Sequence, residues 1–305
     1  MARISDIDLR LLRIFVAVAE ARGFAAAEAY LNISTSTISV HMSNLEKRLG
    51  IHLCERGRGG FRLTERGQIV FQEARAILKS LDDFSGRLSS IKSVLGGQLS
   101  IGMVDGLVSH SAFPISDAVR RFNEVENEVQ IELVVAPRQK LEHDVIEGQL
   151  HAAIGPFVRN ISGLDFVPLY TENHELYCGK GHPLFGVSKK MAGRLDISSF
   201  PSIVRLYQYD FDYEKLGVIR EQAVVNSMEA LLTLLLSGGY IGFLPDHYAR
   251  SWVERGDLSA IPDPDLSYTS THTIVTKRGV RESLALAKFV SLAKDVCVTR
   301  LAEPV

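Results

Sequence analysis

The sequence predicts an α/β protein with an N-terminal all-α winged helix-turn-helix and a two-lobed α/β body. Three observations support this prediction. Residues 8–64 contain short helix patterns followed by a glycine-rich hairpin, residues 65–95 carry one apolar seam, and the remainder alternates strand and helix patterns. We therefore expect a head (1–64), a linker helix (65–95) and a body (96–305).

The head begins with an amphipathic helix over residues 8–21, and a second short helix follows the break at Gly23. Ser34 is a typical N-cap for a third helix, because its hydroxyl can accept a hydrogen bond from the first free amides. Taken alone, these helices also fit a generic helical hairpin. The stripe predicted to be buried repeats at steps of four, three and four residues and consists of Ile38, Met42, Leu45 and Leu49.

The opposite face of the third helix carries small hydroxyl side chains, which let a helix N-terminus approach phosphates and base edges closely. Residues 51–64 contain two short apolar runs around Gly57-Arg58-Gly59-Gly60, a pattern typical of a hairpin. Its clustered arginines indicate a wing that touches the DNA backbone or minor groove, with a solvated turn as the alternative. The residues predicted to contact DNA are Ser34, Thr35, Ser36, Thr37, Ser39, Val40, Ser43, Arg56, Arg58 and Arg62.

Residues 65–95 predict one long helix capped by Thr64. Its apolar residues recur at alternating steps of four and three, the heptad pattern that drives helices to associate along one stripe. About 28 helical residues would span about 42 Å and hold two heads apart in a homodimer that reads two half-sites. A long core helix is the alternative. The seam consists of Val70, Ala74, Ile77, Leu81, Phe84, Leu88, Ile91 and Leu95.

The body alternates strands and helices, and its first block, residues 99–155, predicts βαβ units with a parallel sheet. The chain passes from lobe I (97–161) into lobe II (162–266), where we expect separate strands LDFVPLY and HELYCG, and returns to lobe I (267–305). The two crossings form a hinge, and ligands in such folds bind between the lobes at the carboxyl ends of strands. The sequence has no Walker loop, GxGxxG or HExxH motif, so we predict no catalytic residues, no metal and no cofactor.

The composition is that of a globular protein, with 46% hydrophobic and 23% charged residues. Residues 1–92 hold 14 Lys and Arg against 10 Asp and Glu, and the rest hold 20 against 26, so a basic head precedes an acidic body. No apolar stretch is long enough for a membrane helix and the N-terminus resembles no secretory signal, so we expect a cytoplasmic protein without membrane contact. Cys54, Cys178 and Cys297 lack metal or disulfide spacing; we expect buried thiols, with a redox pair of Cys178 and Cys297 as the alternative.

The stretches IDLRLLRIFVAVAE and LNISTSTISVHMSNLEKRLGIHLCERGRGGFRLTERG resemble the winged head of LysR-type transcriptional regulators. The chain departs from that family at Thr35 and Val40, two positions that the resemblance implies face DNA, so the family's usual base preference is not assumed for this chain. It also departs at Glu28 and Cys54, which we place in the scaffold of the head, where they alter packing rather than function. The matching positions are Phe24, Ala27, Leu31, Ser34, Ser39, Leu45, Glu46, Leu49, Gly50, Arg56, Leu63, Thr64 and Gly67.

The resemblance implies a sequence-specific DNA-binding transcriptional regulator whose body, similar to periplasmic solute-binding proteins, senses a small molecule. The implied partners are double-stranded DNA, the effector, further copies of the chain in a homodimer or homotetramer, and RNA polymerase. Because Arg205 can pair with a carboxylate, we expect an anionic metabolite, although Asp105 argues for an amine or hydroxyls. A loop-structuring role is the alternative for each cleft position. These positions map to Val104, Asp105, Gly106, Pro156, Arg205, Leu206, Asn226 and Ser227.

Three other functions compete with this one. An enzyme would need a nucleophile, a base and an orienting group that converge, and neither Ser109-His110-Ser111 nor Cys178 near His182 announces such a set. A secreted solute-binding protein fits the body but not the winged head or the N-terminus. A DNA-binding protein that needs no ligand stays open, and a ligand that raises the melting temperature would exclude it.

Overall fold

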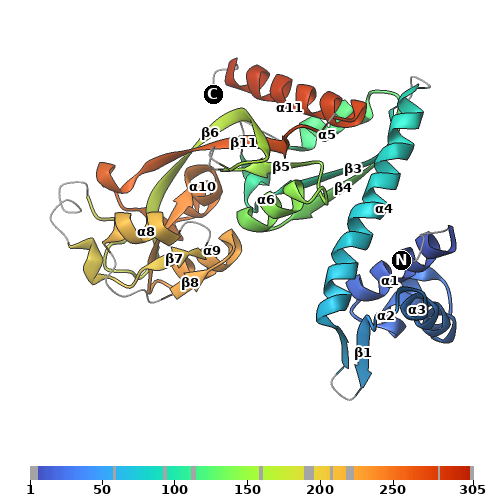
Figure 1. Ribbon diagram of the computed structural model, residues 1–305. Coiled ribbons are helices and arrows are strands. Elements are labelled where there is room, and N and C mark those ends of the chain that lie inside the picture. Colours follow the sequence, from blue (N-terminus) through green and yellow to red (C-terminus); the bar gives the residue numbers. More distant parts are fainter. Residues whose placement is uncertain are drawn as a thin grey trace. The chain divides into compact units, whose positions relative to one another are not determined.

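The computed structural model describes residues 6–57, 60–91, 95–110, 115–157, 161–188, 196–206, 209–217, 223–280 and 282–302. The chain divides into two units, residues 1–88 and 89–305, and each is described by itself. Figure 1 colours the chain from the blue head to the red C-terminal helix. Within the described ranges, every helix is too short or too polar to cross a bilayer.

Three helices and a hairpin form the head: α1 (Asp6–Glu20), α2 (Phe24–Leu31), α3 (Thr35–Leu49), β1 (Cys54–Gly57) and β2 (Gly60–Leu63). The structure confirms the predicted stripe, because Ile38, Met42 and Leu45 of α3 are completely buried against α1 and α2. It also confirms the hairpin, since β1 pairs antiparallel with β2. The apolar period of α3 therefore fixes which side of this helix remains exposed.

The long helix α4 (Glu65–Ile91) follows the hairpin, and Thr64 caps it as predicted, with its Oγ1 accepting the amide of Gly67 at 2.9 Å. A Cβ on Gly67 would lie 1.9 Å from the carbonyl oxygen of Leu53, so the close approach of helix and hairpin requires glycine. The prediction that the seam reaches Leu95 is wrong. Leu95 begins strand β3, where its backbone pairs with the neighbouring strand instead of continuing the helix.

Lobe I of the body contains a parallel set of strands in which β3 (Leu95–Met103) lies between β4 (Asn127–Val135) and β5 (Ala152–Gly155). Side chains of β3 such as Leu99 and Ile101 share one core with helices α5 (Ile115–Asn123) and α11 (Leu284–Ala302). These two helices lie together in Figure 1. The helix α6 (Arg138–Ile146) packs with Ala153 and Val275 in a separate core. The loops after β3, β4 and β5 therefore emerge at one edge of the sheet.

Two long strands join the lobes. They are β6 (Leu164–Gly179) and β11 (Tyr268–Lys277), which pair antiparallel with a register shift between His272 and Thr273. The prediction of two separate strands in β6 is wrong, because Glu172 and its neighbours continue the ladder opposite Ser270 and Thr271. The sheet as a whole is consequently mixed. The parallel arrangement predicted for the strands of residues 99–155 is confirmed, because β3 pairs parallel with both β4 and β5.

Lobe II extends the same sheet with β9 (Ile241–Pro245) and β10 (Leu258–Ala260), both antiparallel to β6. A separate parallel pair consists of β7 (Ile203–Arg205) and β8 (Ala223–Val225). Our sequence prediction did not include α8, α10 or β10. The helices of this lobe are α8 (Tyr209–Leu216), α9 (Met228–Leu236) and α10 (Asp246–Glu254).

Candidate DNA-binding surface and effector pocket

The exposed face of α3 presents the residues that the sequence predicts to contact DNA. Ser34 caps this helix, with its Oγ accepting the amide of Thr37 at 3.3 Å. Ser36 and Thr37 are exposed on the first turn, and Val40 is 59% exposed one turn later. The half-buried residues of the predicted set are Thr35, Ser39 and Ser43. Val40 is an apolar side chain exposed to solvent next to the hydroxyls at the start of α3. This is the pattern of a surface that a binding partner covers.

The arginines of the hairpin are also exposed, and two of them have partners within the head. Arg56 donates from Nη1 to Ser39 Oγ at 3.0 Å, and its guanidinium lies 3.5 Å from the centroid of the Phe24 ring. Arg62 pairs across the hairpin with Glu55, with Nε donating to Oε2 at 2.6 Å. Arg58 lies outside the described residues. The contact between Arg56 and Ser39 joins the hairpin to α3, so these two predicted DNA-contacting elements form one surface.

Glu28 corrects our expectation for the scaffold of the head. Its side chain is exposed rather than packed, and its carboxylate accepts hydrogen bonds from the backbone amide of Thr35, at 3.0 Å, and from the Thr35 hydroxyl. A carboxylate at a helix N-terminus stabilises that helix through the dipole and the free amides. It also places a negative charge at the end of α3 that the sequence predicts to face DNA.

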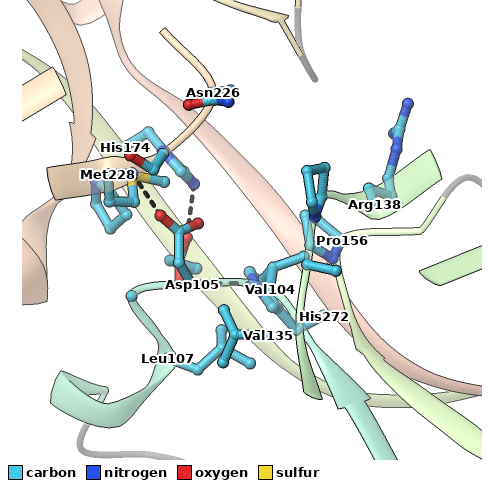
Figure 2. A pocket seen from close by; sticks show the side chains of 16 residues that line it. Val104, Asp105, Leu107, Val135, Arg138, Pro156, His174, Asn226, Met228 and His272 are labelled. Atoms are coloured by element: carbon cyan, nitrogen blue, oxygen red, sulfur yellow. Dashed lines mark hydrogen bonds and ion pairs between the residues drawn. The ribbon is translucent and has the colours of Figure 1, made fainter. Parts of the chain in front are cut away.

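A pocket of about 230 Å³ lies between the lobes of the body. It brings together six of the eight predicted cleft residues: Val104, Asp105, Gly106, Pro156, Asn226 and Ser227. Their role in binding stays a prediction. The pocket is further lined by Leu107, Val135, Ala136, Pro137, Arg138, Glu172, His174, Met228, Pro245 and His272. Figure 2 shows Arg138 across the pocket from His174 and Met228.

Asp105 connects the two lobes at this pocket. Its Oδ2 accepts the backbone amide of Met228, the first residue of α9, at 2.5 Å, and the bond is drawn in Figure 2. Ser227 completes the cap, with Oγ accepting the amide of Ala230 at 3.2 Å. Burial raises the pKa of Asp105, although its backbone hydrogen bonds oppose that shift. The N-terminus of α9, an anion-binding position in general, is therefore already occupied by a carboxylate of the chain itself.

Arg205 and Leu206, the other two predicted cleft residues, do not line the pocket. Arg205 is completely buried and binds Asp212 through two guanidinium nitrogens, with Nε to Oδ2 at 2.8 Å and Nη2 to Oδ1 at 2.5 Å. Its Nη2 also donates to the hydroxyl of Tyr268 at 2.7 Å. In this structure Arg205 holds lobe II together rather than offering its charge to a ligand. The side chain of Leu206 is exposed.

Arg138 is the pocket cation that our sequence prediction missed. It is the first residue of α6, directly after Pro137, and follows the carboxyl end of β4. Its Nε lies 3.5 Å from Glu142 Oε1 and has no hydrogen-bond partner among the described residues. The position could have been found from the rule that ligands bind at strand carboxyl ends. A partly buried guanidinium with an unsatisfied N–H is a natural site for a carboxylate.

Cys178 and Cys297, which the sequence left open as a redox pair, are both free thiols in this structure. Cys178 and Cys297 are both buried and lie in different core clusters, one in each lobe. Burial raises the pKa of the Cys178 thiol to about 11 and that of Cys297 to about 12. Both are therefore protonated near neutral pH, the unreactive form of a thiol.

Two family models match the chain. "Bacterial regulatory helix-turn-helix protein, lysR family" matches residues 9–68, and "LysR substrate binding domain" matches residues 92–298. The HTH-type transcriptional activator BauR of Pseudomonas aeruginosa is 34% identical over 291 residues, which cover 95% of each chain.

Solved structures share the fold over nearly the whole length. Full-length CbnR in complex with its target DNA matches with a TM-score of 0.66 at 21% identity, and covers 94% of this chain and 99% of that chain. Full-length LysG from Corynebacterium glutamicum with bound effector Arg matches with a TM-score of 0.54 at 20% identity, covering 95% and 98%. At these identities the matches establish the architecture of head, long helix and two-lobed body.

Proposed function

The chain belongs to the LysR family of transcriptional regulators, and we propose that it reads operator DNA with α3 and the hairpin and responds to a small carboxylate bound between its lobes. The family is one of transcriptional regulators rather than enzymes. The observation that carries the effector class is Arg138, a pocket guanidinium whose Nε has no hydrogen-bond partner among the described residues and lies 3.5 Å from Glu142 in a long ion pair. A regulator of bacterial DNA works in the cytoplasm, which is the location we propose.

The proposed DNA surface combines the exposed end of α3 with the wing. Ser36, Thr37 and Val40 are exposed side by side on α3, and the hairpin contributes Arg56 and Arg62. Hydroxyls and backbone amides at a helix N-terminus bind phosphates, and arginines of a wing bind the backbone or minor groove. CbnR, which shares the fold, is solved with its target DNA. DNA-binding assays on this surface test the proposal directly.

The long helix supports a homodimer. Val70 and Ala74, at the start of the predicted seam, pack into the core of the head, whereas Phe84 further along is 52% exposed. Ile69, also on α4, is 64% exposed and lines an apolar groove with residues of α1 and α3. Burying such side chains against a second copy gains about 1.5–3 kcal/mol each. We propose that dimers pair through their bodies into a homotetramer, which acts on RNA polymerase when the effector closes the lobes.

The pocket favours an effector with few carbon atoms and one carboxylate. Its cavity of about 230 Å³ is small for a ligand site. The carboxylate would bind Arg138 on one side, because the N-terminus of α9 on the other side already receives Asp105. The mostly apolar positions between them, such as Val104, Pro156 and Met228, would contact the carbon chain. This keeps the anionic class expected from the sequence but moves its cation from Arg205 to Arg138.

Thermal denaturation with a panel of short carboxylic acids and their neutral amides tests the effector class. We expect at least one acid, and not its amide, to raise the melting temperature of the wild type and of Arg121→Gln, a matched control on α5 outside the pocket. The same acid should leave Arg138→Gln unaffected. Equal stabilisation of Arg138→Gln would contradict the assignment of this residue.

Footprinting on the DNA that flanks its own coding region tests the DNA surface. Ser36→Glu places a negative charge on the exposed end of α3, and Arg62→Ala removes a positive charge from the wing. We expect about a 10-fold loss of affinity from each. Gln130→Glu, an exposed position on β4, adds the same charge in the body and should change nothing. Unchanged binding by both head variants would refute the placement of this surface.

A further inference from the structure

A cluster of buried imidazoles surrounds one carboxylate where the lobes meet. Glu172 of β6 lies with its Oε1 2.7 Å from His174 Nε2, and with its Oε2 2.9 Å from His247 Nε2 and 3.7 Å from His272 Nε2. The ring of His110 lies 4.5 Å from that of His247, centroid to centroid. All five side chains are buried, and they come from segments far apart in the chain.

We propose that His110, Glu172 and His247 bind one divalent transition-metal ion of the zinc type. Each of these residues offers one ligand atom, and the three atoms lie within 4.8 Å of one another. Two imidazole nitrogens and one carboxylate oxygen form a ligand set typical of zinc, with room for a fourth ligand. Magnesium and calcium prefer oxygen ligands and fit this set poorly.

The surroundings of Glu172 suit a bound cation. Its side chain is buried, and its ion-pair partners among the described residues are imidazoles: those of His174, His247 and His272. A bound cation would balance the charge of a carboxylate in this position.

Neighbouring groups orient the ligands. Ser109 Oγ lies 3.0 Å from Nδ1 of His247, so this bond can hold the imidazole with Nε2 directed at Glu172. Such outer partners fix the tautomer of a metal-bound histidine. His272, beside the cluster, is 2% exposed, and its Nδ1 has no hydrogen-bond partner among the described residues. A buried polar atom of this kind calls for a group that the protein does not supply, such as a metal-bound water.

The position of the cluster gives the metal a structural consequence. His110 follows the short 3-10 helix Leu107–Ser109 in lobe I, and His247 is the second residue of α10 in lobe II. Glu172 lies on β6, which joins the two lobes. One ion bound to all three would tie the two lobes together beside the pocket, since Glu172 also lines that pocket. Metal binding and lobe closure would then stabilise each other.

The test uses the untagged full-length chain, stripped with a chelator and titrated with Zn(II), and with Co(II) for its visible spectrum. We expect one ion per chain and a Co(II) spectrum of four or five ligands without thiolate charge transfer. Replacing His247 or His110 with Gln should weaken binding about 100-fold or more. His182→Gln is the matched control, because His182 is equally buried in lobe II but packs on Phe200.

Each outcome decides the proposal. A melting temperature that Zn(II) raises for the wild type and His182→Gln, but not for His110→Gln, supports it independently of any activity. If His247→Gln fails to fold, His110→Gln alone gives the answer. No bound metal in the wild type, or equal affinity in the variants, would show that the imidazoles merely satisfy Glu172 through hydrogen bonds. The results of the carboxylate and DNA experiments described above do not depend on the result of this metal experiment.

Discussion

Exchanging Asp212 for Asn tests whether Arg205 is structural. The guanidinium is completely buried, and the carboxylate of Asp212 accepts from its Nε, its Nη2 and the backbone amide of Arg205. In Asp212→Asn the positive charge stays buried in lobe II without a negative partner. The side-chain amide of the introduced Asn also places an N–H donor against the N–H donors of the Arg205 guanidinium. The variant therefore keeps the shape of the side chain and removes its charge.

The expected loss follows from this burial. Removing one partner of a buried ion pair costs about 3–5 kcal/mol, because the other charge is left uncompensated in a low dielectric. For a domain of this size each kcal/mol lowers the melting temperature by about 2–4 °C, which corresponds to a shift of about 10 °C. Replacing both residues, as Arg205→Met with Asp212→Leu, leaves no buried charge, and it should restore most of the stability.

The single tryptophan of the chain, Trp252, lies on α10 in lobe II and reports its unfolding by fluorescence. Urea titrations of the wild type, Asp212→Asn and the double variant would give the three free energies of unfolding. A loss below about 1 kcal/mol in Asp212→Asn, the size of an exposed pair, would refute the argument. If Asp212→Asn has normal stability but no longer responds to the ligand, Arg205 belongs to the effector site after all.

Three further predictions follow from single features. Glu28→Gln should bind DNA several-fold more tightly, because it removes an acid from the end of α3. The slope of log affinity against log salt concentration should become steeper by about one phosphate contact. Equal or weaker binding would contradict this prediction. Burial lowers the pKa of His110 and His272 from 6.5 to about 4. Between pH 4 and pH 6.5 the unfolded chain therefore binds more protons than the folded chain. The free energy of unfolding should therefore fall as pH drops from about 6.5 towards 4, and His272→Gln should flatten that dependence in urea titrations at pH 7 and 5. Phe84→Asp should shift the chain towards monomer in sedimentation, whereas the neighbouring Ser85→Asp should not if the seam is the interface.

Local signals made the head predictable from the sequence. The cap at Ser34, the buried period of α3 and the glycine-rich hairpin each depend on residues a few positions apart, and the structure has all three. The same holds for the cap at Thr64. The end of α4 was misplaced because Leu95 keeps the heptad spacing although its backbone belongs to β3. The spacing of apolar side chains does not determine whether the backbone hydrogen-bonds within a helix or to a neighbouring strand.

The candidate site was only partly predictable, because its chemistry depends on distant pairs. Six residues of the pocket could be named because the resemblance to the LysR-type body maps the cleft positions of that family onto them. The partner of Arg205 lies on α8, a helix without a clear apolar period, so the arginine looked available. The imidazole cluster around Glu172 draws on segments far apart in sequence, and no spacing motif announces it. The sequence predicted two separate strands, LDFVPLY and HELYCG, whereas the residues between them pair with β11 as part of one continuous strand.

The continuous pairing of β6 and β11 limits how the body can move. Ten residues of β11 are paired with β6 across the junction of the lobes. Breaking that ladder to swing the lobes open would expose backbone amides and carbonyls that are now satisfied. A two-stranded ribbon yields more readily in torsion, and its register shift beside His272 marks where the twist can change. An effector that closes the lobes would therefore do so by rotating one half of the body against the other, and the resulting signal would be a change of angle.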